Sequence, residues 1–278
     1  LCFPFVTLIT AFANLFGLGG APLCAMARGK GNREGAQGIM VNAGFMLLLS
    51  GAVLTVLGIA FHRPLLYLFG ASEITYPYAS SYIVIYLLGT LCVMLSLGLN
   101  PYINCQGFAR TGMLTVALGA AANIVLDPIF IFALHLGVRG AAIATVLSQF
   151  LSAAWVVKFL TGKKAELKLN FRGFRPDWHC IQRITVLGIA SFVMSFTDML
   201  VQVACNSMLR GFGGDLYISV MTVLNSVRQI AQTPVLAIAD GASTAISYNY
   251  GARLYRRTRD AIRFMTQIAI GYTMLVWM

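Results

Sequence analysis

The stretch NIVLDPIFIF, residues 123–132, places the carboxylate Asp127 and the imino acid Pro128 inside a run that is otherwise apolar. Apolar runs recur along the chain in blocks of about 20 residues or more, a length that crosses roughly 30 Å of hydrocarbon as a helix. Hydrophobic residues make up 58% of the 278 positions, and charged residues only 10%. The sequence therefore predicts an all-α polytopic membrane protein.

Eight apolar blocks are predicted to be transmembrane helices. They are residues 1–27, 39–61, 77–99, 110–134, 138–160, 184–209, 216–248 and 262–278. The chain starts without an initiator methionine and without the basic segment of a signal peptide, and it stops inside the last block. We therefore expect an internal fragment of a longer chain.

The lysines and arginines that give the net charge of +11 are unequally divided between the two sides of the membrane. With eight spans, alternate connections lie on the same side, and one set of connections holds most of the lysines and arginines. The positive-inside rule assigns this set to the cytoplasm, so both chain ends are expected near the outer face. The basic charge thus indicates membrane lipids as partners and no nucleic acid. We expect a multi-pass protein of a bacterial cytoplasmic membrane.

The residue types that support catalysis do not form recognisable groups in this sequence. The six cysteines show no CxxC pairing, and the three histidines fall in or beside predicted loops. The glycine-rich segment ARGKGN, residues 27–32, lacks the spacing of a phosphate-binding loop. We expect no disulfide, no metal, no cofactor and no enzymatic activity.

A weak internal repeat relates the two ends of the sequence. The Gly-Ala pair at 20–21 matches the pair at 241–242, and Gly29 matches Gly251, at offsets of 221 and 222 residues. In both places small residues lead into a basic cytoplasmic connection. Parallel repeats of this kind occur in transporters, so we predict two related halves.

The offset also predicts how the chain is divided. Residues 1–160 are expected to supply five of six helices of an N-terminal lobe, and residues 184–278 the first three helices of a C-terminal lobe. The basic segment 161–183 between them is expected to be a solvated, lipid-facing cytoplasmic linker. A complete protein would then carry one more helix in front and at least three behind.

Asp127 is the first candidate for a functional residue, because a carboxylate at bilayer depth is costly unless it faces a partner or a cavity. Asn123 lies four residues earlier on the same helical face, and Thr145 of the next span lies at a similar depth, about 10 Å below the outer face. This set of oxygen atoms suits Na⁺, or a proton on the carboxylate. The alternative is that Asp127 only caps a helix break at Pro128, which we also expect to act as a hinge.

A second polar group is predicted in the sixth and seventh blocks. Asp198 shares a helical face with Gln202, and Gln229 lies on a polar stripe of the next span. Arg228 lies at a depth similar to that of Asp198, so the two could form a buried ion pair or contact a substrate. Asp240, nearer the cytoplasmic end, is assigned to helix packing or a gate, with packing preferred.

Several segments resemble the MATE (multidrug and toxic compound extrusion) transporters of bacterial type. They are NPYINCQGFARTGMLTVALGAAANIVLDPIFIF (100–132), GVRGAAIATVLSQ (137–149), ARGKGN (27–32) and SYNYGA (247–252). The resemblance implies a two-lobed bundle of two six-helix repeats around a central cavity. It also implies a cation site made by Asn123, Asp127 and Thr145, together with an aspartate of the first family helix that this sequence lacks.

The resemblance implies a cation-coupled multidrug antiporter that exports amphipathic organic cations by alternating access, driven by Na⁺ or protons. The alternative is a flippase for lipid-linked saccharides, whose cavity should carry several basic residues for pyrophosphate, whereas only Arg228 lies deep in a predicted span. A membrane enzyme or a non-transporting receptor is a third possibility. The complete protein is expected to be a monomer.

Overall fold

The computed structural model describes residues 2–69, 71, 73–171 and 173–277, without the side chains of 206, 210–216, 218 and 277. The described chain is helical and contains no strand. Its elements are α1 (Phe3–Gly29), α2 (Arg33–Leu68), α3 (Tyr76–Leu88), α4 (Thr90–Cys105), α5 (Ala109–Pro128), the π-helical segment η1 (Ile129–Ala133), α6 (Gly137–Thr161), α7 (Trp178–Gly251) and α8 (Tyr255–Trp277).

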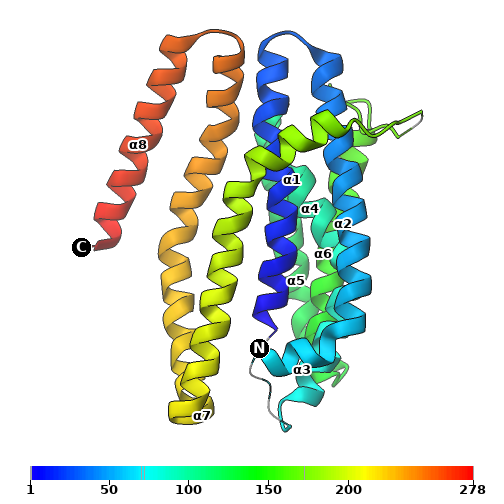
Figure 1. The fold of residues 1–278 in the computed structure, drawn as a ribbon, viewed down its shortest axis with the longest axis vertical. Coiled ribbons are helices and arrows are strands. Elements are labelled where there is room, and N and C mark those ends of the chain that lie inside the picture. The colour runs from blue at the N-terminus through cyan, green and yellow to red at the C-terminus, as the bar shows by residue number, and fades with distance from the viewer. Residues whose placement is uncertain (1, 70, 72, 172, 278) are drawn as a thin grey trace.

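Figure 1 shows α1 to α6 as one bundle of roughly parallel and antiparallel helices, with α7 and α8 beside it. Helix α7 runs down next to α1, turns and returns as a second arm, and α8 follows the returning arm. Among the described residues, five helices are long and apolar enough to cross a membrane, or six if α3 and α4 form one bent span. The chain is therefore a multi-pass helical membrane protein.

Three of the predicted spans differ in the structure. The single span predicted over 77–99 is two helices, α3 and α4, bent by 56° at Gly89. A Cβ at Gly89 would lie 2.7 Å from the Val146 side chain of α6, so the missing side chain lets α6 pack into the bend. The spans predicted over 184–209 and 216–248 are the two arms of the single element α7, which also begins earlier, at Trp178.

Helix α1 packs backbone against backbone with the first arm of α7. A Cβ at Gly19 would lie 2.4 Å from the carbonyl oxygen of Ile184, and a Cβ at Gly188 would meet the carbonyl of Leu15. Small residues allow this close approach, which is how helices commonly associate in membranes. Helix α1 thus joins the α1–α6 bundle to α7.

The second arm of α7 meets α1 at a reciprocal glycine contact. A Cβ at Gly29 would meet the carbonyl oxygen of Tyr248, and a Cβ at Gly251 would lie 2.3 Å from the carbonyl oxygen of Met26. Residues 26 and 29 correspond to 248 and 251 at the same repeat offset of 222. Equivalent positions therefore face each other, as in a self-complementary interface between two related units.

The core beneath these contacts contains one fully buried tyrosine. Tyr102 on α4 donates a hydrogen bond from its hydroxyl to the carbonyl oxygen of Phe16 over 2.8 Å. Gly20 faces this hydroxyl, because a Cβ there would lie within 1.8 Å of it. The tyrosine therefore fills the space that a side chain at Gly20 would otherwise occupy, and it ties α4 to α1.

The basic linker is more ordered than predicted. Ala165, Leu167 and Leu169 are buried in alternation with exposed neighbours, and the amide of Leu167 donates to Oε1 of Gln106 over 2.9 Å. The expectation of a solvated, lipid-facing connector is wrong for this stretch. The reason is that alternate side chains of this stretch lie on one face, which packs against the bundle.

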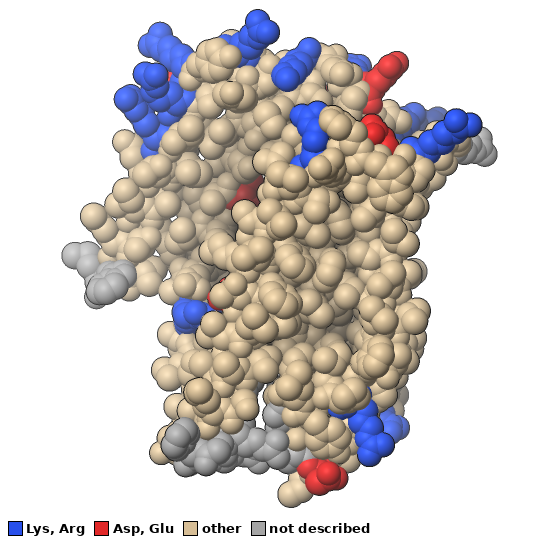
Figure 2. All heavy atoms as spheres, in the orientation of Figure 1, with Lys and Arg blue, Asp and Glu red and all other residues tan. Residues whose placement is uncertain are grey.

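Arg28, at the end of α1, connects several elements at this end of the molecule. Its guanidinium forms an ion pair with Glu166 of the linker at 2.5 Å and donates to the carbonyl oxygen of Cys105. It also lies over the ring of Tyr248 on α7, 5.9 Å from the ring centre. The same end carries most of the Lys and Arg side chains in Figure 2, so by the positive-inside rule it faces the cytoplasm.

Candidate functional site

A polar cavity of about 730 Å³ lies where α1, α4, α5, α6 and α7 converge. Each of these helices contributes hydroxyl or amide side chains to its wall. Asn14 comes from α1, Asn100 and Asn104 from α4, Asn123 from α5 and Gln149 from α6. The oxygen atoms Oδ1 of Asn100 and Asn104 are buried and have no hydrogen-bond partner within the described protein. Both oxygens lie against Gly112 of α5, within the packed wall, and the cavity itself is lined by the other amide and hydroxyl groups.

The residues of the predicted cation site lie beside this cavity. Asn123 donates from Nδ2 to Oδ1 of Asp127 over 3.2 Å, as their spacing on one helical face predicts. Thr145 donates its hydroxyl to the carbonyl of Ala141 over 2.9 Å and lines the cavity with Asn123. Tyr82 of α3 lies close enough to the Thr145 side chain and to Asp127 to interact electrostatically with both.

These four residues, the oxygen cluster, therefore join three helices at one point: Tyr82 from α3, Asn123 and Asp127 from α5, and Thr145 from α6. Within the described residues the structure has one ion pair, Arg28 with Glu166, so Asp127 has no cationic side-chain partner there. A carboxylate surrounded by amide and hydroxyl groups can hold a hard cation or a proton. The binding of a cation or a proton by the oxygen cluster stays a prediction. The contribution of an aspartate from the first family helix, which this sequence lacks, also stays a prediction.

Pro128 marks a change of helical type. Helix α5 ends at this residue, and the next five residues form the π-helical segment η1. Proline removes one backbone donor, and π-helical turns inside helices frequently occur at functional sites. The irregular turn lies directly after Asp127, which agrees with a hinge at Pro128 but does not test its motion.

The second predicted group is not assembled in the structure. Asp198 and Arg228 form no ion pair, both side chains are exposed, and neither lines the polar cavity. Gln202 and Gln229 are also absent from the cavity wall. Counting residues gives the depth of a side chain but not its direction around the helix axis. The equal depth of Asp198 and Arg228 was therefore not sufficient to predict an ion pair. Contact of these four residues with a substrate stays a prediction.

Asp240 was assigned to helix packing or a gate, with packing preferred, and the structure places it in the wall of the cavity. It is the only carboxylate among the described residues that line the cavity, and it lies near Ser243 and Thr244 on the same arm of α7. A Cβ at the neighbouring Gly241 would meet nothing within 4 Å, so no helix packs closely there. A carboxylate in an apolar segment was the sequence signal that could have identified Asp240. Its large separation along the sequence from the Asp127 motif gave no indication that the two segments meet at one cavity.

Comparison with known proteins identifies the family of this fold and site. A family model described as MatE matches residues 1–129 and 190–278. The chain belongs to the MatE family. The MatE relatives described next are named as transporters or export proteins and not as enzymes.

A multidrug export protein, MepA of Staphylococcus haemolyticus strain JCSC1435, is 26% identical over 263 residues, which is 95% of this chain and 58% of that protein. A solved outward-facing conformation of a multidrug resistance MATE family transporter superimposes with a TM-score of 0.87 at 27% identity, over 99% of this chain and 61% of the other. An inward-facing conformation of such a transporter superimposes with a TM-score of 0.81 at 26% identity, over 99% of this chain and 63% of the other. The chain thus spans about three fifths of the length of these MatE relatives.

The contacts at the basic end join α1 to α7. There Gly29 and Gly251 hold α1 against α7, which closes the cytoplasmic side of the cavity in this conformation.

Proposed function

We propose that the protein is part of a cation-coupled multidrug antiporter that exports amphipathic organic cations by alternating access. The observation that carries the proposal is the oxygen cluster at Asp127 beside a polar cavity between α1, α4, α5, α6 and α7. Entry of Na⁺ or a proton at this cluster would neutralise Asp127 and so change the free energy of helix α5 in its two conformations. Membrane lipids surround the protein, and the complete protein is expected to act as a monomer.

The cavity chemistry supports a cationic substrate. The described residues of its wall include one carboxylate, Asp240, and neither lysine nor arginine. A positively charged ligand would therefore be stabilised there by Asp240 and by the amide and hydroxyl side chains of the wall. A flippase for lipid-linked saccharides would need positive charge to bind a pyrophosphate, and the described wall supplies none. The antiporter is accordingly the better supported of the two functions.

The test uses the full-length protein in inverted membrane vesicles, with ethidium accumulation as the readout under an imposed Na⁺ or pH gradient. We expect one gradient to drive accumulation and Asp127→Asn to abolish that response, because an amide cannot titrate or neutralise a cation. Tyr82→Phe should weaken ion dependence without abolishing it, since only one hydroxyl of the oxygen cluster is lost. The exposed Asp260 on α8 provides a matched control, and Asp260→Asn should leave the response unchanged.

Unimpaired accumulation by Asp127→Asn under both gradients would show that the carboxylate is structural. If the unsubstituted protein moves no dye under either gradient, the antiporter proposal fails and the flippase becomes the function to test, with a fluorescent lipid-linked saccharide.

A further inference from the structure

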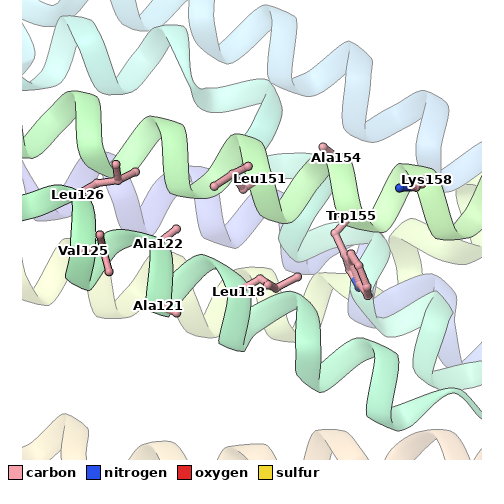
Figure 3. Close-up of a pocket in the computed structure, with 9 residues that line it drawn as sticks. All are labelled: Leu118, Ala121, Ala122, Val125, Leu126, Leu151, Ala154, Trp155 and Lys158. Atoms are coloured by element: carbon pink, nitrogen blue, oxygen red, sulfur yellow. The ribbon is translucent and has the colours of Figure 1, made fainter.

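Helices α5 and α6 enclose a second space, on a face different from the one that lines the polar cavity. It is a groove of about 660 Å³ that opens to the outside of the bundle. Figure 3 shows its lining residues, which are apolar except at one end: Leu118, Ala121, Ala122, Val125 and Leu126 from α5, with Leu151, Ala154, Trp155 and Lys158 from α6. The small side chains of Ala121, Ala122 and Ala154 leave this space open.

The charged end of the groove lies at the cytoplasmic boundary. Lys158 is in the last turn of α6, whose end carries the basic linker, and its side chain is exposed. Trp155 lies one turn deeper, about 4.5 Å along the helix axis. Tryptophan is enriched at this level of a bilayer, and a lysine beside it extends its ammonium toward the headgroups. The indole nitrogen of Trp155 has no hydrogen-bond partner within the described protein.

We propose that this groove binds one anionic phospholipid of the cytoplasmic leaflet. An acyl chain lies along Leu151, Ala122 and Val125, and the headgroup phosphate binds the Lys158 ammonium. The groove matches this ligand in both chemistry and polarity, because its apolar part points into the membrane and its single positive charge lies at the headgroup level. Lysine near a membrane surface favours anionic lipid by a modest electrostatic term.

A second groove in the same molecule gives an internal comparison. It measures about 470 Å³, lies between α1 and α2, and is lined by apolar residues such as Leu8, Leu54 and Phe61, with no charged side chain in its described wall. A lipid tail can occupy it, but nothing in that wall selects a headgroup. Selectivity for anionic lipid is therefore assigned to the groove at Lys158.

The experiment uses Trp155 as its own reporter. In the protein with Trp178→Phe and Trp277→Phe, Trp155 is the remaining tryptophan of residues 1–278. This variant is reconstituted into vesicles that contain either phosphatidylglycerol or phosphatidylcholine with brominated acyl chains, which quench tryptophan fluorescence on contact. We expect half-maximal quenching at about fivefold lower mole fraction of brominated phosphatidylglycerol, the preference that one surface lysine gives.

The variants separate headgroup binding from general lipid contact. Lys158→Gln should abolish the preference while quenching itself persists, and Lys158→Arg should retain the preference because it keeps the charge. Lys163→Gln, a matched loss of charge in the nearby linker, should change neither. Equal quenching by the two lipids in the parent, or an unchanged preference in Lys158→Gln, would overturn the proposal. Ala154→Phe fills the groove and should reduce quenching by both lipids.

Discussion

The reciprocal glycine contact between α1 and α7 predicts how the closed cytoplasmic end responds to a single side chain. In Gly251→Leu, the new Cβ would lie 2.3 Å from the carbonyl oxygen of Met26, whereas ordinary contacts begin at 3.4 Å. The carbonyl is part of a helix backbone and cannot rotate away, so the two helices must separate by about 1 Å. Overpacking of this kind typically costs about 1–3 kcal/mol.

That cost applies only while the two helix ends are in contact. It therefore shifts the equilibrium toward the conformation that is open to the cytoplasm, by a factor of roughly 5 to 150. The readout is a cysteine at Thr244, which lines the cavity about 10 Å from Gly251 along α7. In a background without the six native cysteines, a membrane-impermeant maleimide added to inverted vesicles should label Thr244→Cys faster by up to this factor.

Gly271→Leu on α8 is the control, because a Cβ at Gly271 meets nothing within 4 Å. Gly29→Ala should act in the same direction as Gly251→Leu, since its Cβ would meet the carbonyl of Tyr248. An unchanged labelling rate in a Gly251→Leu protein that still elutes as a single folded species would refute the reasoning. In that case the glycine contact would not control access to the cavity.

Two further predictions concern stability. Gln106→Ala removes the acceptor of the Leu167 amide, at a cost of about 1–2 kcal/mol to the packing of the linker. Trypsin should therefore cleave after Lys163 several-fold faster, as followed by SDS gel electrophoresis. An unchanged cleavage rate would mean that the linker is held by other contacts. Tyr102→Phe removes the side-chain donor to the Phe16 carbonyl, which keeps its backbone bond within α1, and should lower the free energy of unfolding by about 0.5–1.5 kcal/mol, seen as a lower Tm. An equal Tm would show that this hydrogen bond contributes nothing.

The sequence predicted the helical membrane fold because apolar length and charge asymmetry are properties of each segment alone. It did not predict the bend at Gly89, because glycine in an apolar run is compatible with a straight helix until a neighbour such as Val146 packs against it. Nor did it predict the buried residues of the linker, since the basic composition concealed the alternation of Leu167 and Leu169 with exposed positions. Both features depend on contacts between distant segments.

The residues of the candidate site also divide into those that the sequence could predict and those that it could not. The pairing of Asn123 with Asp127 follows from helical spacing and could be predicted. Tyr82 could not, because it comes from another helix and carries no signal of its own in an apolar stretch. Asp198 and Arg228 illustrate the opposite error, since residues at equal depth need not point toward each other.

The contacts of Arg28 are distributed so that α7 can separate from α1 and return. Two of its partners, Glu166 and the carbonyl of Cys105, lie on the linker and on α4, which pack with the α1–α6 bundle, and only the ring of Tyr248 belongs to α7. When α7 moves away from α1, the guanidinium, whose side chain is 14% exposed, loses a contact worth about 1–2 kcal/mol and keeps its charged partner. The charge is never left buried and unpaired, so the cost of the movement at Arg28 is limited to the contact with Tyr248.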